Sequence, residues 1–159
     1  MVKKYWWIPM FVLSSAFSGW AADPEFIADQ FPYVLEVEHF SIQSGRIVSD
    51  RDAGNGKAVL SESLNFSARV TVFLKEAGRY LLTLYEKTTA GNKDSIHIKI
   101  NNGPDVRTYP PVELYGVYAP CKHKAPIILK GPGKVTVTLF TTNEYGSYYD
   151  QAIIDKLDD

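Results

Sequence analysis

Apolar and polar residues alternate along most of the chain, and this period of two is the period of β-strands. The segment 95–100 is the clearest case, because every second residue is Ile and the residues between them are His97 and Lys99. Other segments that alternate, or that are dense in Leu, Val, Ile and Tyr, are 33–40, 69–74, 79–87, 134–140 and 150–157. Apolar patterns of helical period do not extend beyond about two turns. The sequence therefore predicts a chain built of strands.

Glycine, proline and asparagine stand between the predicted strands, where the chain must reverse. The clearest turn sequences are at 77–78, 101–104 and 131–133. Short strands separated by such turns are typical of an all-β sandwich or barrel. The segment 106–126 follows neither pattern and contains four prolines and three tyrosines. Long irregular excursions in a compact domain are often binding loops.

The first 22 residues have the pattern of a secretory signal peptide. Lys3 and Lys4 precede an uncharged stretch, 5–20, and small residues around Ala21 match a cleavage site after Ala21 or Ala22. An uncleaved membrane anchor is the alternative, but the stretch is shorter than the ~20 residues that span a bilayer. We therefore predict an exported protein, secreted or periplasmic, with no membrane span after cleavage. Residues 23–32 are then a short lead-in to a single domain over 33–159.

Composition narrows the class of protein. The chain has 159 residues, of which 45% are hydrophobic, and a formal net charge of −1, which fits one globular domain. It has no cluster of Lys and Arg, so we expect no nucleic-acid partner. Removal of residues 1–22 would leave no Trp but nine of the ten Tyr. Cys121 is the single cysteine, so an exported chain cannot form an internal disulfide.

Several short segments occur in an order that resembles a known family of binding modules. They are 35–40 (LEVEHF), 53–59 (AGNGKAV), 75–82 (KEAGRYLL) and 150–154 (DQAII). Over residues 33–157 this order is similar to that of carbohydrate-binding modules of families six and thirty-five and their galactose-binding-like relatives. The resemblance implies a non-catalytic jelly-roll β-sandwich of two antiparallel sheets, a structural calcium ion, and a sugar site in the loops at one end or on a sheet face. It also implies that Glu36, Glu38 and Asp150 hold the calcium.

The acidic residues themselves give a reason for a cation. On one continuous strand, Glu36 and Glu38 would share an otherwise apolar face, and two carboxylates there repel each other and are costly to bury. Calcium, which takes about six to eight oxygen ligands, is the natural counter-ion in an exported protein. The alternative is that both Glu lie on a solvated edge. Asp52 is a further candidate ligand, although an ordinary solvated turn also accounts for the acidic segment 50–56.

Two tyrosine-rich segments provide the candidates for contact with a sugar. Aromatic faces stack on the C–H face of a sugar ring, and polar side chains bond its hydroxyls. The candidate residues are Tyr115, Tyr118, Asn143, Tyr145 and Tyr148. The alternative is that these tyrosines are half-buried strand or corner residues, as we expect for Tyr80, Tyr85 and Tyr149. The lack of Trp outside residues 1–22 departs from many modules of the resembled family.

The sequence shows no catalytic signature. The three His are scattered, and the patterns G-x-S-x-G, H-E-x-x-H and Ser-His-Asp do not occur. Cys121 and His123 fall short of a tetrahedral metal-ligand set. Together with the resemblance to carbohydrate-binding modules, this predicts a non-catalytic protein that binds a polysaccharide or oligosaccharide. The alternatives are a jelly roll that has lost sugar binding and docks a protein partner through 106–126, and a small lyase or hydrolase.

Overall fold

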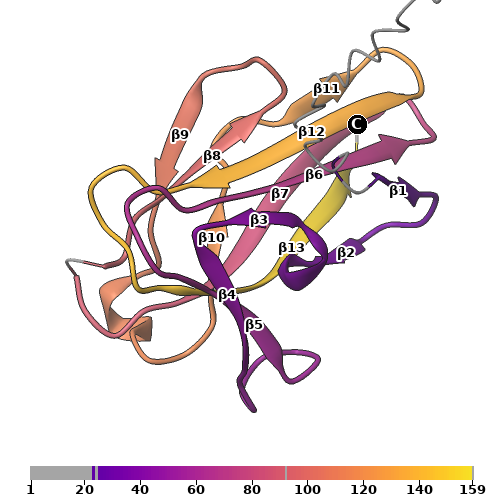
Figure 1. Cartoon of the computed structure of the whole chain (residues 1–159). Coiled ribbons are helices and arrows are strands. Elements are labelled where there is room, and N and C mark those ends of the chain that lie inside the picture. The colour runs from indigo at the N-terminus through magenta and orange to yellow at the C-terminus, as the bar shows by residue number, and fades with distance from the viewer. Residues whose placement is uncertain (1–22, 24, 92, 159) are drawn as a thin grey trace, which may run out of the picture.

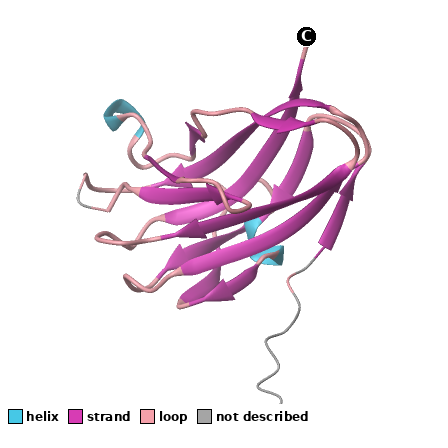
Figure 2. Ribbon diagram, turned by 90° about the horizontal axis from the view of Figure 1, so that it is seen from above, coloured by secondary structure: helices cyan, strands magenta, loops and turns pink. Residues whose placement is uncertain are grey.

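The computed structural model describes residue 23, residues 25–91 and residues 93–158, so the predicted signal peptide lies outside the described residues. Two β-sheets pack face to face (Figures 1 and 2). Regular structure is otherwise confined to two short 3-10 turns in the described part of the chain, η1 (Val37–His39) and η2 (Val112–Leu114). Among the described residues, no helix has the length and apolar character needed to cross a bilayer.

The first sheet, here called sheet A, has the strand order β1-β6-β12-β8-β9, and β3 also pairs with β6. Its strands are β1 (Glu25–Ala28), β3 (Ser41–Gln43), β6 (Ser67–Leu74), β8 (Ile96–Ile100), β9 (Asp105–Thr108) and β12 (Gly133–Phe140). Neighbouring strands run antiparallel except β1, which runs parallel to β6. The central pair, β6 and β12, is joined over its full length, from Leu74 opposite Gly133 to Ser67 opposite Phe140.

The second sheet, sheet B, has the order β10-β7-β13-β5-β4 and is antiparallel throughout. Two short strands extend it, because β11 pairs with β7 and β2 pairs with β13. The strands are β2 (Tyr33–Glu36), β4 (Gly45–Ser49), β5 (Lys57–Ser61), β7 (Gly78–Lys87), β10 (Ala119–Lys122), β11 (Ile127–Leu129) and β13 (Tyr148–Leu157). The last strand in the sequence, β13, thus lies in the interior of the sheet between β7 on one side and β2 and β5 on the other.

The core lies between the sheets and is formed by alternate residues, as the period of two predicts. On β12 the fully buried residues are Val135, Val137 and Leu139, while Thr136 and Thr138 are only partly buried. Strand β6 shows the same alternation, with Val70, Val72 and Leu74 inward. Full burial of each such side chain stabilises the fold by about 1.5–3 kcal/mol. The predicted all-β jelly-roll sandwich is confirmed.

Two segments near the N-terminus differ from the expectation. Residues 23–32, expected to be a lead-in, contribute β1 to the edge of sheet A and bury Ala28 completely. The expected continuous strand over 33–40 is broken by η1 after Glu36. The reason is topological, since β2 belongs to sheet B and β3 to sheet A, and η1 carries the chain across. Glu36 and Glu38 therefore do not share a strand face, and that part of the argument for a cation was wrong.

Candidate functional site

Strand β13 changes its partner on one side at Asp150. Tyr148 and Tyr149 pair with β5, whereas the four residues from Gln151 to Ile154 pair with β2. On the opposite side, the register between β13 and β7 shifts between Tyr149 and Ala152. Bulges of this kind redirect a side chain out of the regular alternation. Asp150 thus lies where β2, β5 and β13 meet, a place called the strand junction below.

Glu36, Glu38 and Asp150 are brought together at the strand junction by different elements. Glu36 ends β2, Glu38 lies in η1, and Asp150 occupies the irregular part of β13. The turn 50–56 covers them: the backbone N–H of Gly54 donates to Asp150 Oδ2 at 3.0 Å, and the amide of Asn55 donates to Glu38 Oε1.

Each of the three carboxylates keeps one buried oxygen that has no hydrogen-bond partner among the described residues. These atoms are Glu36 Oε2, Glu38 Oε2 and Asp150 Oδ1. Burial raises the pKa of Glu36 and of Asp150; hydrogen bonds from Gln151 and Gly54 oppose the rise, and neighbouring carboxylates add to it. Buried carboxylate oxygens without partners are costly, and a hard cation is one kind of group that can satisfy such oxygens.

The described residues contain no group of three or more His, Cys, Asp and Glu side chains already arranged as a metal site. Calcium accepts backbone carbonyl and amide oxygens as well as carboxylates. The oxygens at the strand junction are of the kind that calcium binds, but the three carboxylates would have to come closer together, and the turn 50–56 or the chain around Asp150 would have to supply further oxygens.

A lysine that the sequence did not single out lies between two of the predicted tyrosines. Lys87 Nζ is 4.8 Å from the ring centroid of Tyr118 and 5.3 Å from that of Tyr148. The same ammonium group pairs with Asp50, which also accepts a hydrogen bond from the Tyr118 hydroxyl at 3.0 Å. Burial by itself would raise the pKa of Asp50, but the hydrogen bonds from Lys87, the Asp52 backbone and Tyr118 lower it. Burial and Asp50 raise the pKa of Tyr118, so this hydroxyl stays protonated and is engaged within the protein.

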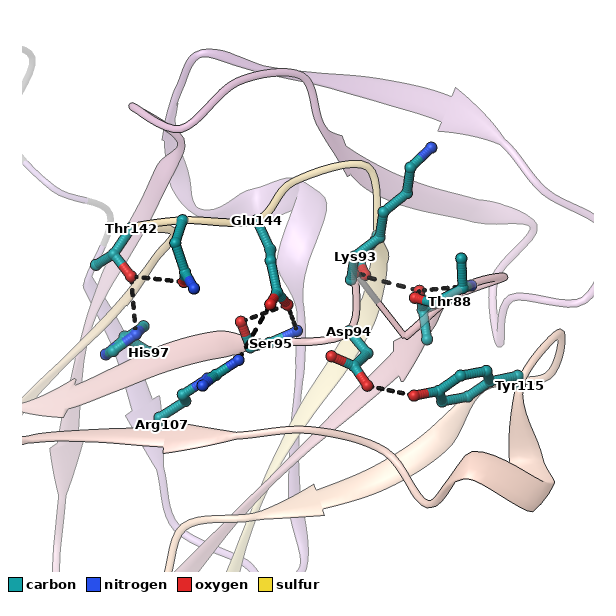
Figure 3. A network of polar contacts seen from close by, with 12 residues as sticks. Thr88, Lys93, Asp94, Ser95, His97, Arg107, Tyr115, Thr142 and Glu144 are labelled. Carbon is teal, nitrogen blue, oxygen red and sulfur yellow. Dashed lines mark hydrogen bonds and ion pairs between the residues drawn. The ribbon is translucent and has the colours of Figure 1, made fainter.

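Tyr115 and Glu144 belong to a second polar network, shown in Figure 3. The Tyr115 hydroxyl donates to Asp94 Oδ2, and this hydrogen bond raises the pKa of Tyr115 to about 12. Glu144 Oε2 accepts from both the backbone N–H and the hydroxyl of Ser95, at 3.0 Å and 2.7 Å, and Glu144 Oε1 accepts from Arg107 at 3.1 Å. The loop before β13 is thereby fixed to β9 and to the residue that precedes β8.

The two remaining candidates, Asn143 and Tyr145, flank Glu144 and face solvent. Tyr145 is 48% exposed, and Asn143 is also exposed, with its Oδ1 accepting from the Thr142 hydroxyl at 3.1 Å. The chain after Tyr145 is held as well, because the backbone N–H of Gly146 donates to Ser61 Oγ at 2.9 Å. Gly146 has φ of 104°, a conformation that favours glycine. Tyr145 is thus an exposed ring on a fixed loop.

The fold of this chain occurs in known protein structures. No family model and no curated protein matches the sequence. A family 35 carbohydrate-binding module from Clostridium thermocellum superposes with a TM-score of 0.62 at 18% identity, covering 77% of this chain and 98% of the other. The CBM36-1 domain of a multidomain xylanase from the hindgut metagenome of Trinervitermes trinervoides gives a TM-score of 0.56 at 17% identity, with 80% and 98% covered.

The chain has the fold of a carbohydrate-binding module. The resemblance noted in the sequence therefore holds at the level of fold. The exo-β-1,3-galactanase of Phanerochaete chrysosporium contains a similar unit, with a TM-score of 0.65 and 18% identity over 77% of this chain. This chain spans only 29% of the galactanase, so the activity of that whole enzyme does not transfer to it.

Within this carbohydrate-binding-module fold, the five predicted sugar contacts fall into three groups. Tyr118 and Tyr148 flank Lys87, Tyr115 bonds Asp94, and Asn143 and Tyr145 lie on the loop before β13. The sequence pattern singled out neither Lys87 nor Asp94, and it pointed to Asp50 only as part of the acidic segment 50–56. Lys87 reaches Tyr148 because the two residues are opposite each other in the register of β7 and β13. Only a correct strand pairing would have revealed it.

Proposed function

We propose that the protein is an exported, non-catalytic carbohydrate-binding protein with a structural calcium ion. Its glycan contacts are Tyr145 and Asn143 on the loop before β13, together with the rings of Tyr115, Tyr118 and Tyr148 beside it. The modules with the same fold, named above as carbohydrate-binding modules, support the class of function. The described part of the chain offers loops with aromatic and amide side chains for this purpose.

The observation that carries the proposal is the exposed Tyr145 ring on a loop that is held from both sides. On one side of Tyr145, Glu144 is bonded to Ser95 and Arg107. On the other side, the backbone N–H of Gly146 is bonded to Ser61. An exposed aromatic ring whose backbone is already fixed loses little conformational entropy when a ligand stacks on it. The neighbouring Asn143 amide provides both a donor and an acceptor for sugar hydroxyls.

The calcium part of the proposal rests on the three unpartnered carboxylate oxygens at the strand junction. Glu36, Glu38 and Asp150 would hold the ion, and the ion would offset the neighbouring negative charges that raise the pKa of Glu36 and of Asp150. Bound there, it would fix the turn 50–56 against β2 and β13. That turn also carries Asp50, the partner of Lys87 and Tyr118. Calcium would therefore also help to hold Asp50 beside these two residues.

A screen against immobilised and soluble polysaccharides tests the proposal, run once with calcium and once with chelator. We expect retention on at least one polysaccharide, no new reducing ends or unsaturated products, and loss of retention in Tyr145→Ala. Tyr109→Ala is the matched control, because Tyr109 is 60% exposed but lies outside the candidate set. Equal retention of both variants would remove Tyr145 from the site, and silence across a broad panel would contradict sugar binding.

A second candidate function is docking of a protein partner through the segment between β9 and β10. Apolar side chains are exposed there: Val112 is 71% exposed and Val117 is 52% exposed. Exposed apolar groups that gather on one loop are typical of interaction surfaces. A stable partner that co-purifies and is lost in Val112→Ser, together with a silent glycan screen, would favour this function over the first.

A further inference from the structure

His97 is bonded to two other elements on the outer face of sheet A. It lies on β8 between the buried Ile96 and Ile98, and its side chain is 16% exposed. Its Nδ1 is 3.1 Å from Asp105 Oδ2 on β9, and its Nε2 is 3.0 Å from the Thr142 hydroxyl in the loop before β13 (Figure 3). The ring of His97 also stacks on a phenylalanine ring of β12, with centroids 5.2 Å apart. Both ring nitrogens are therefore engaged, one by each neighbouring element.

The Thr142 hydroxyl connects His97 to one of the proposed sugar contacts. Thr142 Oγ1 donates a hydrogen bond to Asn143 Oδ1 at 3.1 Å. Asn143 is exposed, so its amide group is accessible to a ligand. An amide has an acceptor end and a donor end. With Oδ1 bonded to Thr142, the donor end of Asn143, Nδ2, is the one left for a ligand.

The number of hydrogen atoms in this chain of bonds gives the protonation state of the ring. The Thr142 hydroxyl has one hydrogen, which it donates to Asn143, so it can only accept from His97 Nε2. The ionised carboxylate of Asp105 can also only accept, so Nδ1 must donate to it. Both ring nitrogens then carry a hydrogen, which is the charged form of histidine. These four side chains are thus arranged around a positively charged His97.

Loss of one proton from His97 requires a different set of bonds. Asp105 still needs a donor at Nδ1, so Nε2 becomes the acceptor, and the Thr142 hydroxyl must turn to donate to it. Thr142 then has no hydrogen left for Asn143 Oδ1, but its oxygen is free to accept. The arrangement that restores both bonds has the Asn143 amide turned over, with Nδ2 donating to Thr142 and Oδ1 directed away from it.

The charged side chains around His97 come from β8, β9 and the loop before β13. Arg107 on β9 lies opposite His97 but pairs with Glu144 in the loop, at 3.1 Å. Lys99 on β8 lies opposite Asp105, and the part of β12 that pairs with β8 adds no charge. Carboxylates, lysines and arginines ordinarily keep their charge between pH 5 and pH 8, whereas histidines change theirs. His97 is therefore the member of this group through which pH acts in that range.

We propose that His97 is a positioning residue of the sugar site: its protonation, passed on through the Thr142 hydroxyl, sets which end of the Asn143 amide faces a ligand. The charged ring leaves Nδ2 to donate to a sugar oxygen, and the neutral ring leaves Oδ1 to accept from a sugar hydroxyl. Ring and glycosidic oxygens, which only accept, are bonded only in the first state. The role in sugar binding rests on the function proposed above, whereas the coupling between His97 and Asn143 does not.

The coupling is tested without any sugar, by NMR of the ¹⁵N-labelled protein between pH 5 and pH 8. We expect the side-chain amide resonances of Asn143 to move with the same midpoint as the ring resonances of His97. Thr142→Val removes the hydroxyl that links these residues, so His97 should still titrate while the Asn143 response is largely lost. The matched control is Thr138→Val, on the same face of sheet A but opposite Lys99, which should respond as the wild type does.

Two results of this titration would overturn the proposal. An Asn143 amide that does not respond to pH in the wild type would show that the hydroxyl and the amide keep their bonds when His97 loses its proton. A response that persists in Thr142→Val would show that Asn143 senses only the charge of the ring, without the hydroxyl between them.

The consequence for binding is measured as retention on xylan and on β-1,3-galactan at pH 5.5 and pH 8. Retention of the wild type should differ between the two pH values by about threefold or more, the effect of one hydrogen bond. This difference should shrink in Thr142→Val and remain in Thr138→Val. Equal wild-type retention at both pH values would overturn the role of His97 in binding. Silence on both polysaccharides at both pH values would count against the proposed function instead, and the NMR titration then decides the coupling by itself.

Discussion

Part-buried carboxylates are held in opposite ways at two places in this protein, the loop before β13 and the strand junction. Glu144, in the loop before β13, has both oxygens filled by Ser95 and Arg107. Burial would raise the pKa of Glu144, but these partners lower it. At the strand junction, Glu36 and Asp150 each keep a buried oxygen without a partner among the described residues, and the pKa of each is raised. Hydrogen-bond donors of the protein thus occupy both oxygens of Glu144. At the proposed calcium site, each carboxylate has one oxygen without a donor among the described residues.

Glu86 is the strictest test of this comparison, because its Oε1 is also buried without a partner in the described part of the chain. It is 0% exposed on β7, and the Cys121 Sγ lies 3.6 Å from its Oε2. Burial raises the pKa of Glu86 to about 8, against smaller opposing contributions from Ser147 and Cys121. Here the open oxygen belongs to an acid that can keep its proton, so no cation is required.

The largest expected effect is on the pH dependence of stability. The unfolded state releases the Glu86 proton near pH 4.5 while the folded state keeps it until about pH 8, so the free energy of unfolding falls across this window. The loss is about 4–5 kcal/mol. In Glu86→Gln this loss should disappear, so urea unfolding at pH 5 and pH 8 should differ less than in the wild type. The same pH slope in both proteins would show that Glu86 ionises normally, and a response of Glu86→Gln to calcium unlike that of the wild type would place an ion there instead.

The next effect is that of calcium on the strand junction. At a calcium concentration of about one hundred times the dissociation constant, the ion should stabilise the fold by about 2.7 kcal/mol, a rise in Tm of several degrees. Glu38→Gln should lower Tm in calcium but not in chelator. Glu62→Gln is a matched control, because Glu62 pairs with Arg46 on the surface. If Glu38→Gln loses the same stability in both buffers, the junction holds no calcium.

A smaller loss is expected at the filled carboxylate. Glu144→Gln weakens the bonds from Ser95 and Arg107 and should lower the free energy of unfolding by about 1.5–3 kcal/mol at neutral pH. Because the folded pKa is lowered, this contribution is present above about pH 4.5 and is lost as the pH falls through the folded pKa. The difference between variant and wild type, measured by urea unfolding at pH 7 and pH 3, should therefore shrink in acid. It should be the same in calcium and in chelator, and a calcium-dependent difference would break the contrast between the two groups.

The smallest effect on stability is expected for Tyr145→Ala. Its ring is half exposed and no described element packs against it as core, so the free energy of unfolding should change by less than about 0.5 kcal/mol. Retention on a polysaccharide should fall nonetheless. Thermal unfolding in parallel with the retention assay separates the two readouts. A large drop in Tm would mean that Tyr145 has a structural role.

The strands were predictable because alternation reports burial directly. In β12 the inward positions 135, 137 and 139 are all aliphatic, so the sequence alone shows the face that packs. Glu86 was not predictable by the same logic. It occupies an inward position of β7 after Tyr80, Leu82 and Leu84, but a charged residue type is normally assigned to the outside. Its burial depends on a neutral form that composition does not reveal.

The site was only partly predictable, for reasons of distance along the chain. The grouping of Glu36, Glu38 and Asp150 came from a family resemblance, and the structure brings them together by a route that strand periodicity did not foresee, through η1 and an irregular β13. The position of Lys87 between Tyr118 and Tyr148 depends on pairings among β7, β10 and β13, which are distant in the sequence. Register of this kind is set by the whole fold.

The interior place of β13 has a consequence for how the chain matures. Sheet B cannot be completed until residues 148–157 have been synthesised, because β2, β5 and β7 all pair with them. Until then, the growing polypeptide exposes unpaired edges and cannot lock into its native topology, and pairing between such remote segments is slow. A polypeptide that stays unfolded until residues 148–157 have been made can still pass through a narrow translocation channel. If the protein is exported as proposed above, this order of strands would help to keep the chain extended during export.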